Sequence, residues 1–120
     1  MCGITGFLTG KPVDRESGLG YLQQMTTALA HRGPDAEGLF LSTDGQVGFG
    51  HRRLSILDLS PAGAQPMRTS DGRFVLTYNG EIYNFKDLRK QLQTSGCLFN
   101  GGSDTEVLLY AIAAWGVERT

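Results

Sequence analysis

The chain has 120 residues, 40% of them hydrophobic, and its 11 basic and 12 acidic side chains give a formal net charge of -1 at pH 7. This length suits one globular domain or part of one, and the balanced charge argues against nucleic acid or an anionic membrane as a partner. No apolar run approaches the roughly 18 residues of a membrane span, and no basic-then-apolar signal segment opens the chain. We therefore expect a cytoplasmic protein.

The first half of the sequence predicts three strands and one helix. Residues 3–8 are short, apolar and β-branched and predict a strand. In residues 19–31, apolar side chains recur at the spacing of one buried helix face. Residues 37–43 and 46–54 predict an antiparallel hairpin, and Asp44-Gly45 between them is typical of a tight type I′ turn.

The second half predicts a loop, a strand and two helices. Residues 60–66 contain two prolines and no apolar periodicity, which indicates a surface loop, and residues 73–78 predict a strand. Asn84 can cap a helix that Gly96 ends. Residues 103–106 match a capping box that opens a helix stopped at Gly116. Antiparallel strands with interspersed helices indicate an α+β fold class.

Cys2 is the residue most suited to nucleophilic chemistry. Removal of Met1 would place a thiol and an α-amine on one residue. An α-amine has a pKa of about 7.7–8.0, so near neutral pH it is well suited to accept the thiol proton. If Met1 stays, that nitrogen is an amide and cannot act as a base. The position alone is equally compatible with an incidental terminal cysteine.

Other chemistries have weaker support. Cys97 is expected to be a small buried hydrophobe. The two cysteines and two histidines lack the spacing of a zinc motif, so we predict no metal site. No glycine-rich phosphate loop is present, so we expect no cofactor in this chain. His31 and His51 are expected to support the fold rather than to transfer protons.

Five short motifs occur in order along almost the whole chain: MCGITG (1–6), HRGPD (31–35), GHRRLSI (50–56), YNGEIY (78–83) and GGSDTE (101–106). SILD (55–58) and GAQP (63–66) lie between them. With these motifs the chain resembles the glutaminase domain of glutamine-hydrolysing asparagine synthetases, a class II, N-terminal-nucleophile amidotransferase domain. The resemblance implies hydrolysis of glutamine to glutamate and ammonia through a thioester on Cys2.

The resemblance also assigns roles to five further residues. Asn79 and the N–H of Gly80 map to the oxyanion donors, Arg53 to the arginine that binds the substrate α-carboxylate, and Glu81 and Asp104 to the acceptors of its α-amino group. Four of the five have a structural alternative: Asn79-Gly80 as a hairpin turn, Arg53 as a solvated strand residue, and Asp104 as a carboxylate favoured in the first turn of a helix.

The fold implied by the resemblance is a four-layer αββα sandwich of antiparallel sheets, which 120 residues do not fill. We therefore expect residues 1–120 to be the N-terminal part of the amidotransferase domain, without its later strands and without the ATP- and magnesium-dependent synthetase domain. Unpaired sheet edges then favour a homo-oligomer. The alternatives are a silent glutamine-binding or assembly fragment, or an asparagine synthetase-like enzyme with another ammonia acceptor.

Overall fold

A computed structural model describes residues 1–55 and 60–120. Most of the SILD motif, Ile56, Leu57 and Asp58, lies outside the described residues. The chain divides into two compact units. The first consists of Met1–Ser55, Ala64–Pro66 and Thr77–Asn79, and the second contains Met67–Leu76 and Gly80–Thr120 together with residues 60–63. No helix in the described part of the chain is long and apolar enough to cross a membrane.

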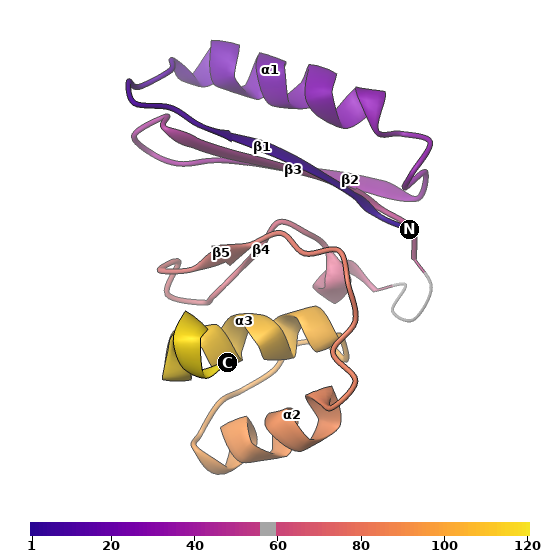
Figure 1. Cartoon of the computed structure of the whole chain (residues 1–120), viewed down its shortest axis with the longest axis vertical. Helices are drawn as coiled ribbons and strands as arrows, with labels where there is room; N and C mark the ends of the chain where they lie inside the picture. The colour runs from indigo at the N-terminus through magenta and orange to yellow at the C-terminus, as the bar shows by residue number, and fades with distance from the viewer. Residues whose placement is uncertain (56–59) are drawn as a thin grey trace. The chain divides into compact units, whose positions relative to one another are not determined.

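The first unit is a three-stranded antiparallel sheet with one helix on one face (Figure 1). The strands lie in the order β1 (Gly3–Leu8), β3 (Val47–Arg53), β2 (Ala36–Leu41), and the helix is α1 (Arg15–Ala28). The predicted strand at residues 3–8 and the predicted antiparallel hairpin are confirmed, with β2 and β3 slightly shorter than expected. Gly3 pairs with Arg52 and Leu8 with Val47, so β1 pairs with all of β3 except Arg53.

Helix α1 begins four residues earlier than the apolar periodicity predicts. Asp14 is its N-cap, and the Asp14 carboxylate accepts a hydrogen bond from the Ser17 N–H at 2.9 Å. The helix ends at Ala28, before Leu29. Leu22 on its inner face is completely buried. The cap therefore decides where the helix starts, whereas the apolar pattern identifies which face is buried.

The predicted type I′ turn between β2 and β3 is wrong. A type I′ turn needs positive φ at both central residues, and in this connection only Gly45 has it, at φ 70°. The Gly45 N–H donates to the Ser42 carbonyl, and the Asp44 carboxylate accepts from the Gln46 N–H at 3.1 Å. The Asp44 side chain thus stabilises a longer connection in which only the glycine is left-handed.

Strand β3 presents two different faces because successive side chains alternate. Gly48 lies on the α1 side, where an added Cβ would stand 3.0 Å from a Leu22 methyl group, so α1 packs directly against the backbone. Phe49, His51 and Arg53 point to the opposite face, where Phe49 stacks on Phe40 with 6.1 Å between ring centroids. The alternation therefore separates Arg53 from its neighbour Arg52.

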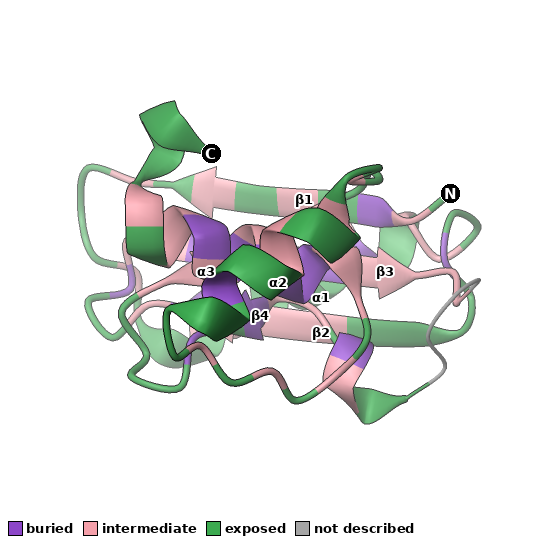
Figure 2. Cartoon of the chain, turned by 90° about the horizontal axis from the view of Figure 1, so that it is seen from below, coloured by how far each residue is buried: buried purple, intermediate pink, exposed green. Residues whose placement is uncertain are grey.

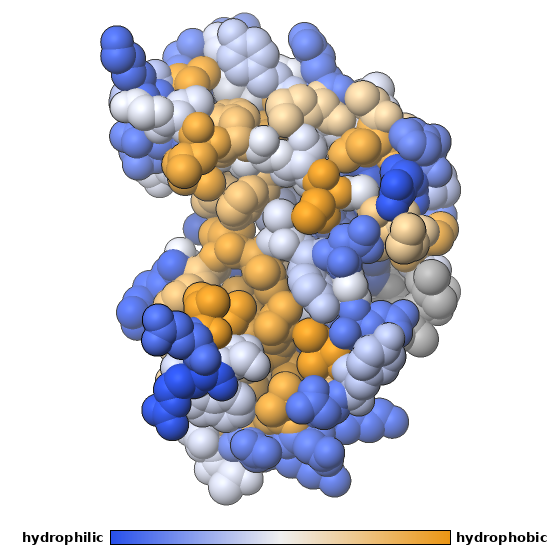
Figure 3. Space-filling model, viewed as in Figure 1, coloured by the Kyte–Doolittle hydropathy of each residue, from blue (hydrophilic) through white to orange (hydrophobic). Residues whose placement is uncertain are grey.

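In the second unit, α3 (Asp104–Trp115) lies between α2 (Phe85–Thr94) and a two-stranded sheet of β4 (Met67–Arg68) and β5 (Val75–Leu76) (Figure 1). Its core consists of Leu92, Val107 and Ala111. Figure 2 shows buried positions along α3, while the outer side of α2 is exposed. Apolar side chains also gather at the surface over α3 in Figure 3. Two short 3₁₀ helices, η1 (Pro61–Gly63) and η2 (Val117–Arg119), complete the described elements.

Both predicted helices of this unit are confirmed, but their caps differ from expectation. Asn84 occupies the N-cap of α2 without a side-chain hydrogen bond, and Gly96 follows the helix at φ 91°. Ser103 caps α3 by accepting from the Glu106 N–H at 3.2 Å. The reciprocal half of the capping box is absent because the Glu106 carboxylate turns elsewhere. The sequence missed β4, and the strand expected at residues 73–78 is only Val75–Leu76.

Together these elements confirm the α+β class with antiparallel sheets.

Candidate active site

Cys2 lies immediately before β1, where the pairing of Gly3 with Arg52 brings it beside the segment that follows Arg53. The Leu54 N–H donates to the Cys2 sulfur at 3.3 Å, and the thiol faces the Leu54 carbonyl at 3.7 Å. The side chain is half-buried. This contact holds the sulfur beside the segment that follows β3.

Asn79 reaches the same end of β1. Its carboxamide Nδ2 donates to the Cys2 carbonyl oxygen at 3.0 Å, across 77 residues of sequence. The hairpin alternative for Asn79-Gly80 is wrong, because β5 ends at Leu76 and residues 80–84 form no strand. The preceding residue, Tyr78, is held by its N–H, which donates to Gln65 Oε1 at 2.6 Å. Tertiary contacts therefore determine the position of Asn79.

The two arginines at the end of β3 have different surroundings. The Arg52 guanidinium donates to the Gly33 carbonyl at 2.9 Å and forms an ion pair with Glu37 at 2.7 Å. This pair and a hydrogen bond from Gln23 lower the pKa of Glu37, with Gln23 the larger cause. Arg53 lies on the opposite strand face, the face of Cys2 and His51. The structure therefore gives Arg52 a structural role and leaves Arg53 on the side of the candidate nucleophile.

His51 is buried on the central strand, with only 1% of its surface exposed. Burial lowers the pKa of His51, a backbone hydrogen bond with Tyr78 raises it, and the positive charge of Arg53 lowers it. The ring is therefore neutral at pH 7. A neutral buried histidine is consistent with the expected supporting role.

The second unit holds the remaining candidates. Gly80 and Glu81 are exposed. Asp104 opens α3, and its Oδ2 accepts a hydrogen bond from the Ile82 N–H at 2.8 Å. Asp104 thus occupies the helix N-terminus expected of a structural carboxylate and also lies beside the 80–82 segment.

Sequence reasoning missed the role of Glu106. This carboxylate is 3% exposed and accepts from the N–H groups of Asn100 and Gly101 at 2.7 and 2.9 Å. It holds the loop that leads into Asp104. The capping-box spacing predicted that this carboxylate caps α3, whereas the structure pairs it with the preceding loop. The contacts of Leu54 with Cys2 and of Gln65 with Tyr78 were also missed. A sequence pattern does not indicate which backbone N–H or which loop glutamine will form a tertiary hydrogen bond.

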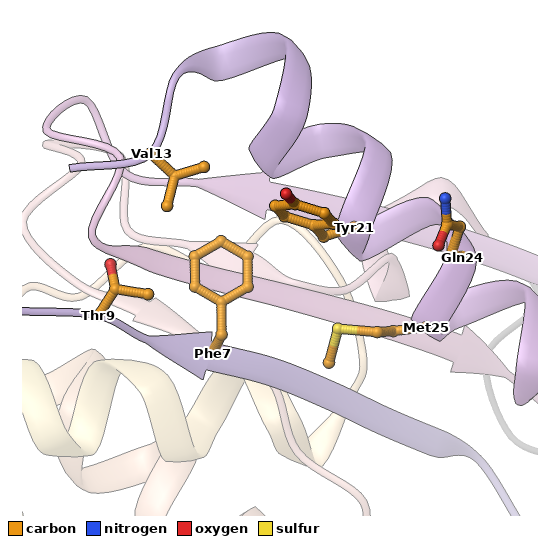
Figure 4. A pocket seen from close by; sticks show the side chains of 6 residues that line it. All are labelled: Phe7, Thr9, Val13, Tyr21, Gln24 and Met25. Carbon is orange, nitrogen blue, oxygen red and sulfur yellow. The ribbon is translucent and has the colours of Figure 1, made fainter. Parts of the chain in front are cut away.

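An apolar hollow in the first unit lies away from these residues. It lies between β1 and α1, has a volume of about 330 Å³, and is lined by Phe7, Thr9, Val13, Tyr21, Gln24 and Met25 (Figure 4). No charged side chain lines it, so it offers no partner for the charged ends of an amino acid. Among the described residues, no group of three or more His, Cys, Asp or Glu side chains could hold a metal ion.

Comparison with known proteins identifies the family of this chain. A family model described as a glutamine amidotransferase domain matches residues 1–120. The chain is 44% identical over 113 residues to asparagine synthetase [glutamine-hydrolyzing] 1 of Bacillus subtilis, covering 91% of this chain and 17% of that protein. It is 38% identical over 125 residues to amidase chry2 of Gibberella zeae, with 98% of this chain and 18% of the relative covered.

A plant relative shows the same partial match. The chain is 37% identical over 118 residues to asparagine synthetase [glutamine-hydrolyzing] 1 of Arabidopsis thaliana, covering 98% of this chain and 20% of that protein. The chain thus spans about a fifth of the length of the curated relatives it matches.

Proposed function

The chain belongs to the glutamine amidotransferase domain family, and we propose that it hydrolyses the side-chain amide of glutamine to glutamate and ammonia with Cys2 as the nucleophile. One observation carries the proposal. The Asn79 carboxamide, the candidate oxyanion donor, lies 3.0 Å from the backbone of the candidate nucleophile although 77 residues separate the two in sequence.

The nucleophile needs a base, and removal of Met1 supplies one. Met1 is 75% exposed, so an aminopeptidase can reach it. The new α-amine of Cys2 takes the thiol proton, and the sulfur attacks the amide carbon of glutamine. The tetrahedral intermediate collapses as the C–N bond breaks, the amine returns the proton to the departing ammonia, and a glutamyl thioester remains. Water then attacks the thioester, which releases glutamate and restores the thiol.

The oxyanion of both tetrahedral intermediates requires preorganised donors. We assign the Asn79 Nδ2 and the Gly80 N–H to this role. The Asn79 carboxamide is already directed at the Cys2 end of β1, where its hydrogen bond to the Cys2 carbonyl holds it. Rotation of this side chain toward the reacting carbon exchanges that bond for one to the oxyanion.

The charged ends of glutamine require one cation and acceptors for an ammonium group. We assign the α-carboxylate to Arg53, because a guanidinium donates two parallel hydrogen bonds and Arg52 already pairs with Glu37. We assign the α-amino group to Glu81 and Asp104. The support is that the Ile82 N–H bond to Asp104 places this carboxylate beside the segment that carries Glu81.

The proposal extends beyond residues 1–120. We propose that the ammonia passes to an ATP- and magnesium-dependent asparagine synthetase domain; the support is that two relatives are named asparagine synthetase [glutamine-hydrolyzing]. Another ammonia acceptor is the alternative, and it is favoured by the relative that is named an amidase. For the fold we propose the four-layer αββα sandwich of the N-terminal-nucleophile class. Its support is that each unit contains an antiparallel sheet packed against a helix.

The test combines intact mass with glutamine-dependent glutamate release. The wild-type protein is compared with Cys2→Ala and with the matched control Cys97→Ala, which removes the other cysteine from the second unit. We expect the mass without Met1 and glutamate release that Cys2→Ala abolishes and Cys97→Ala retains. Turnover that survives Cys2→Ala would overturn the assignment. Processed protein that binds glutamine without turnover would favour the silent-fragment alternative.

A second comparison separates binding from chemistry. Arg53→Ala should raise the KM for glutamine with a smaller effect on kcat, because the α-carboxylate is held in both the ground and the transition state. Arg52→Ala is the control from the opposite strand face. Equal KM values in the two variants would remove the case for Arg53.

A further inference from the structure

His51 is the buried polar side chain that the proposed reaction leaves unused. It is 1% exposed and lies in the centre of the sheet, opposite Ile4 on β1 and Gly38 on β2. Its Nε2 is buried and has no hydrogen-bond partner among the described residues. The ring nevertheless makes a hydrogen bond with the backbone of Tyr78, so Nδ1 is the nitrogen that makes it. A buried imidazole with one nitrogen unsatisfied has a cost in stability that a hydrophobic residue would avoid.

The Tyr78 backbone is the segment that carries Asn79. Its N–H donates to Gln65 Oε1 at 2.6 Å, and its carbonyl is the acceptor available to the His51 ring. That carbonyl belongs to the peptide group that joins Tyr78 to Asn79. A hydrogen bond to it therefore fixes the orientation of the backbone from which the Asn79 side chain extends.

We propose that His51 is a positioning residue: it donates from Nδ1 to the Tyr78 carbonyl and thereby holds the Asn79 carboxamide against the Cys2 end of β1. The catalytic consequence rests on the proposed function, because it assumes that Asn79 stabilises the oxyanion. The structural part, that the orientation of Asn79 depends on the His51 N–H, stands independently of any activity.

The surroundings of the ring keep it in the form that this role requires. Burial and the nearby Arg53 guanidinium both lower the pKa of His51, so the ring is neutral and carries a single N–H. A proton on Nε2 would find no acceptor in residues 1–55 and 60–120. The single proton therefore stays on Nδ1, where Tyr78 accepts it.

Three variants test the role through activity. His51→Asn keeps an N–H donor near the position of Nδ1, His51→Leu keeps the bulk without a donor, and His31→Leu is the control at the exposed histidine. We expect His51→Leu to lower kcat by about 10-fold or more with KM for glutamine little changed, a smaller loss than the about 10²–10³ for deletion of an oxyanion donor itself. His51→Asn should recover most of that loss.

A double-variant cycle separates positioning from general loss of structure. If His51 acts through Asn79, then His51→Leu costs nothing further in kcat once Asn79→Ala is present. Multiplicative losses in the double variant would show that His51 acts elsewhere and would overturn the proposal.

A readout independent of turnover keeps the two proposals distinguishable. The Asn79 side-chain NH₂ resonances, assigned by their absence in Asn79→Ala, report the hydrogen bond to Cys2. We expect His51→Leu to move them to the positions of a free carboxamide and to speed their hydrogen exchange, and His51→Asn to leave them unchanged. Unchanged resonances in folded His51→Leu would refute the positioning role even in an active enzyme. Shifted resonances in a protein without glutaminase activity would support positioning and refute the proposed function.

Discussion

Gly33 controls where the end of β3 lies, and its replacement by alanine is the sharpest test of the first unit. Gly33 is buried against the backbone of the two arginines: an added Cβ would lie 2.5 Å from the Arg52 carbonyl oxygen and 2.6 Å from the Arg53 nitrogen. Ordinary contacts of a Cβ begin at 3.4 Å. The backbone around Gly33 and the backbone at the end of β3 must therefore separate by about 1 Å, because neither contacted atom belongs to a flexible side chain.

This displacement has an energetic and a functional consequence. Overpacking of this kind costs about 1–3 kcal/mol, which should lower the melting temperature by about 5–15 °C in a domain of this size. It also moves Arg53, and a displacement of about 1 Å at a substrate-positioning residue can cost about 10²-fold in catalytic efficiency. We therefore expect Gly33→Ala to lose both stability and affinity for glutamine.

The matched control is Gly20→Ala. Gly20 lies inside α1, and an added Cβ there would meet no atom within 4 Å, so alanine should stabilise the helix by about 0.5–1 kcal/mol. Thermal and urea unfolding of both variants measure the difference directly, and steady-state kinetics measure the KM. An unfolding midpoint of Gly33→Ala equal to that of the wild-type protein would refute the close-packing argument.

Three further outcomes are expected. Glu106→Gln should lower the free energy of unfolding by about 1–3 kcal/mol, because an amide brings a donor toward the N–H groups that the carboxylate accepts; urea midpoints equal to those of the exposed-site control Glu118→Gln would contradict this. Because burial lowers the pKa of His51, the unfolded chain binds a proton near pH 6.5 that the folded chain does not, so stability should fall as pH drops below about 6.5. Urea titrations at pH values below about 6.5 should show a smaller loss of unfolding free energy in His51→Asn than in the wild-type protein. Identical pH slopes in the two proteins would reject His51 as the cause. The outer edges of β1 and β2 pair with no strand in the described residues, and Leu8 is 80% exposed, so sedimentation at micromolar concentration should show a homo-oligomer rather than a single monomer boundary.

Local patterns determined the elements of this protein. A short apolar, β-branched run located β1, and Asp44-Gly45 located the hairpin that contains β3. Helical apolar spacing located α2, and Ser103 and Gly116 located the two ends of α3, because caps and periodicity act over a few neighbouring residues. Where local rules compete, the sequence was less informative. The Asp44 carboxylate accepts from the Gln46 N–H and stabilises a longer connection than the type I′ turn that Asp-Gly predicts. Strand β4 has only two residues, too few to show a periodic pattern.

The candidate site divides in the same way. The residue types and motif order of the sequence nominated Cys2, Asn79 and Arg53, but they could not show which of two adjacent arginines faces the nucleophile. The pairing of β1 with β3 decided that, because a strand alternates its faces and only the register assigns each face a neighbour. The contact between Asn79 and Cys2 and the burial of His51 likewise depend on chain segments that meet only in the folded molecule. The sequence by itself determined which chemical groups are present, and the tertiary structure decided which of them meet, because hydrogen bonds and burial depend on distance in space rather than on separation along the chain.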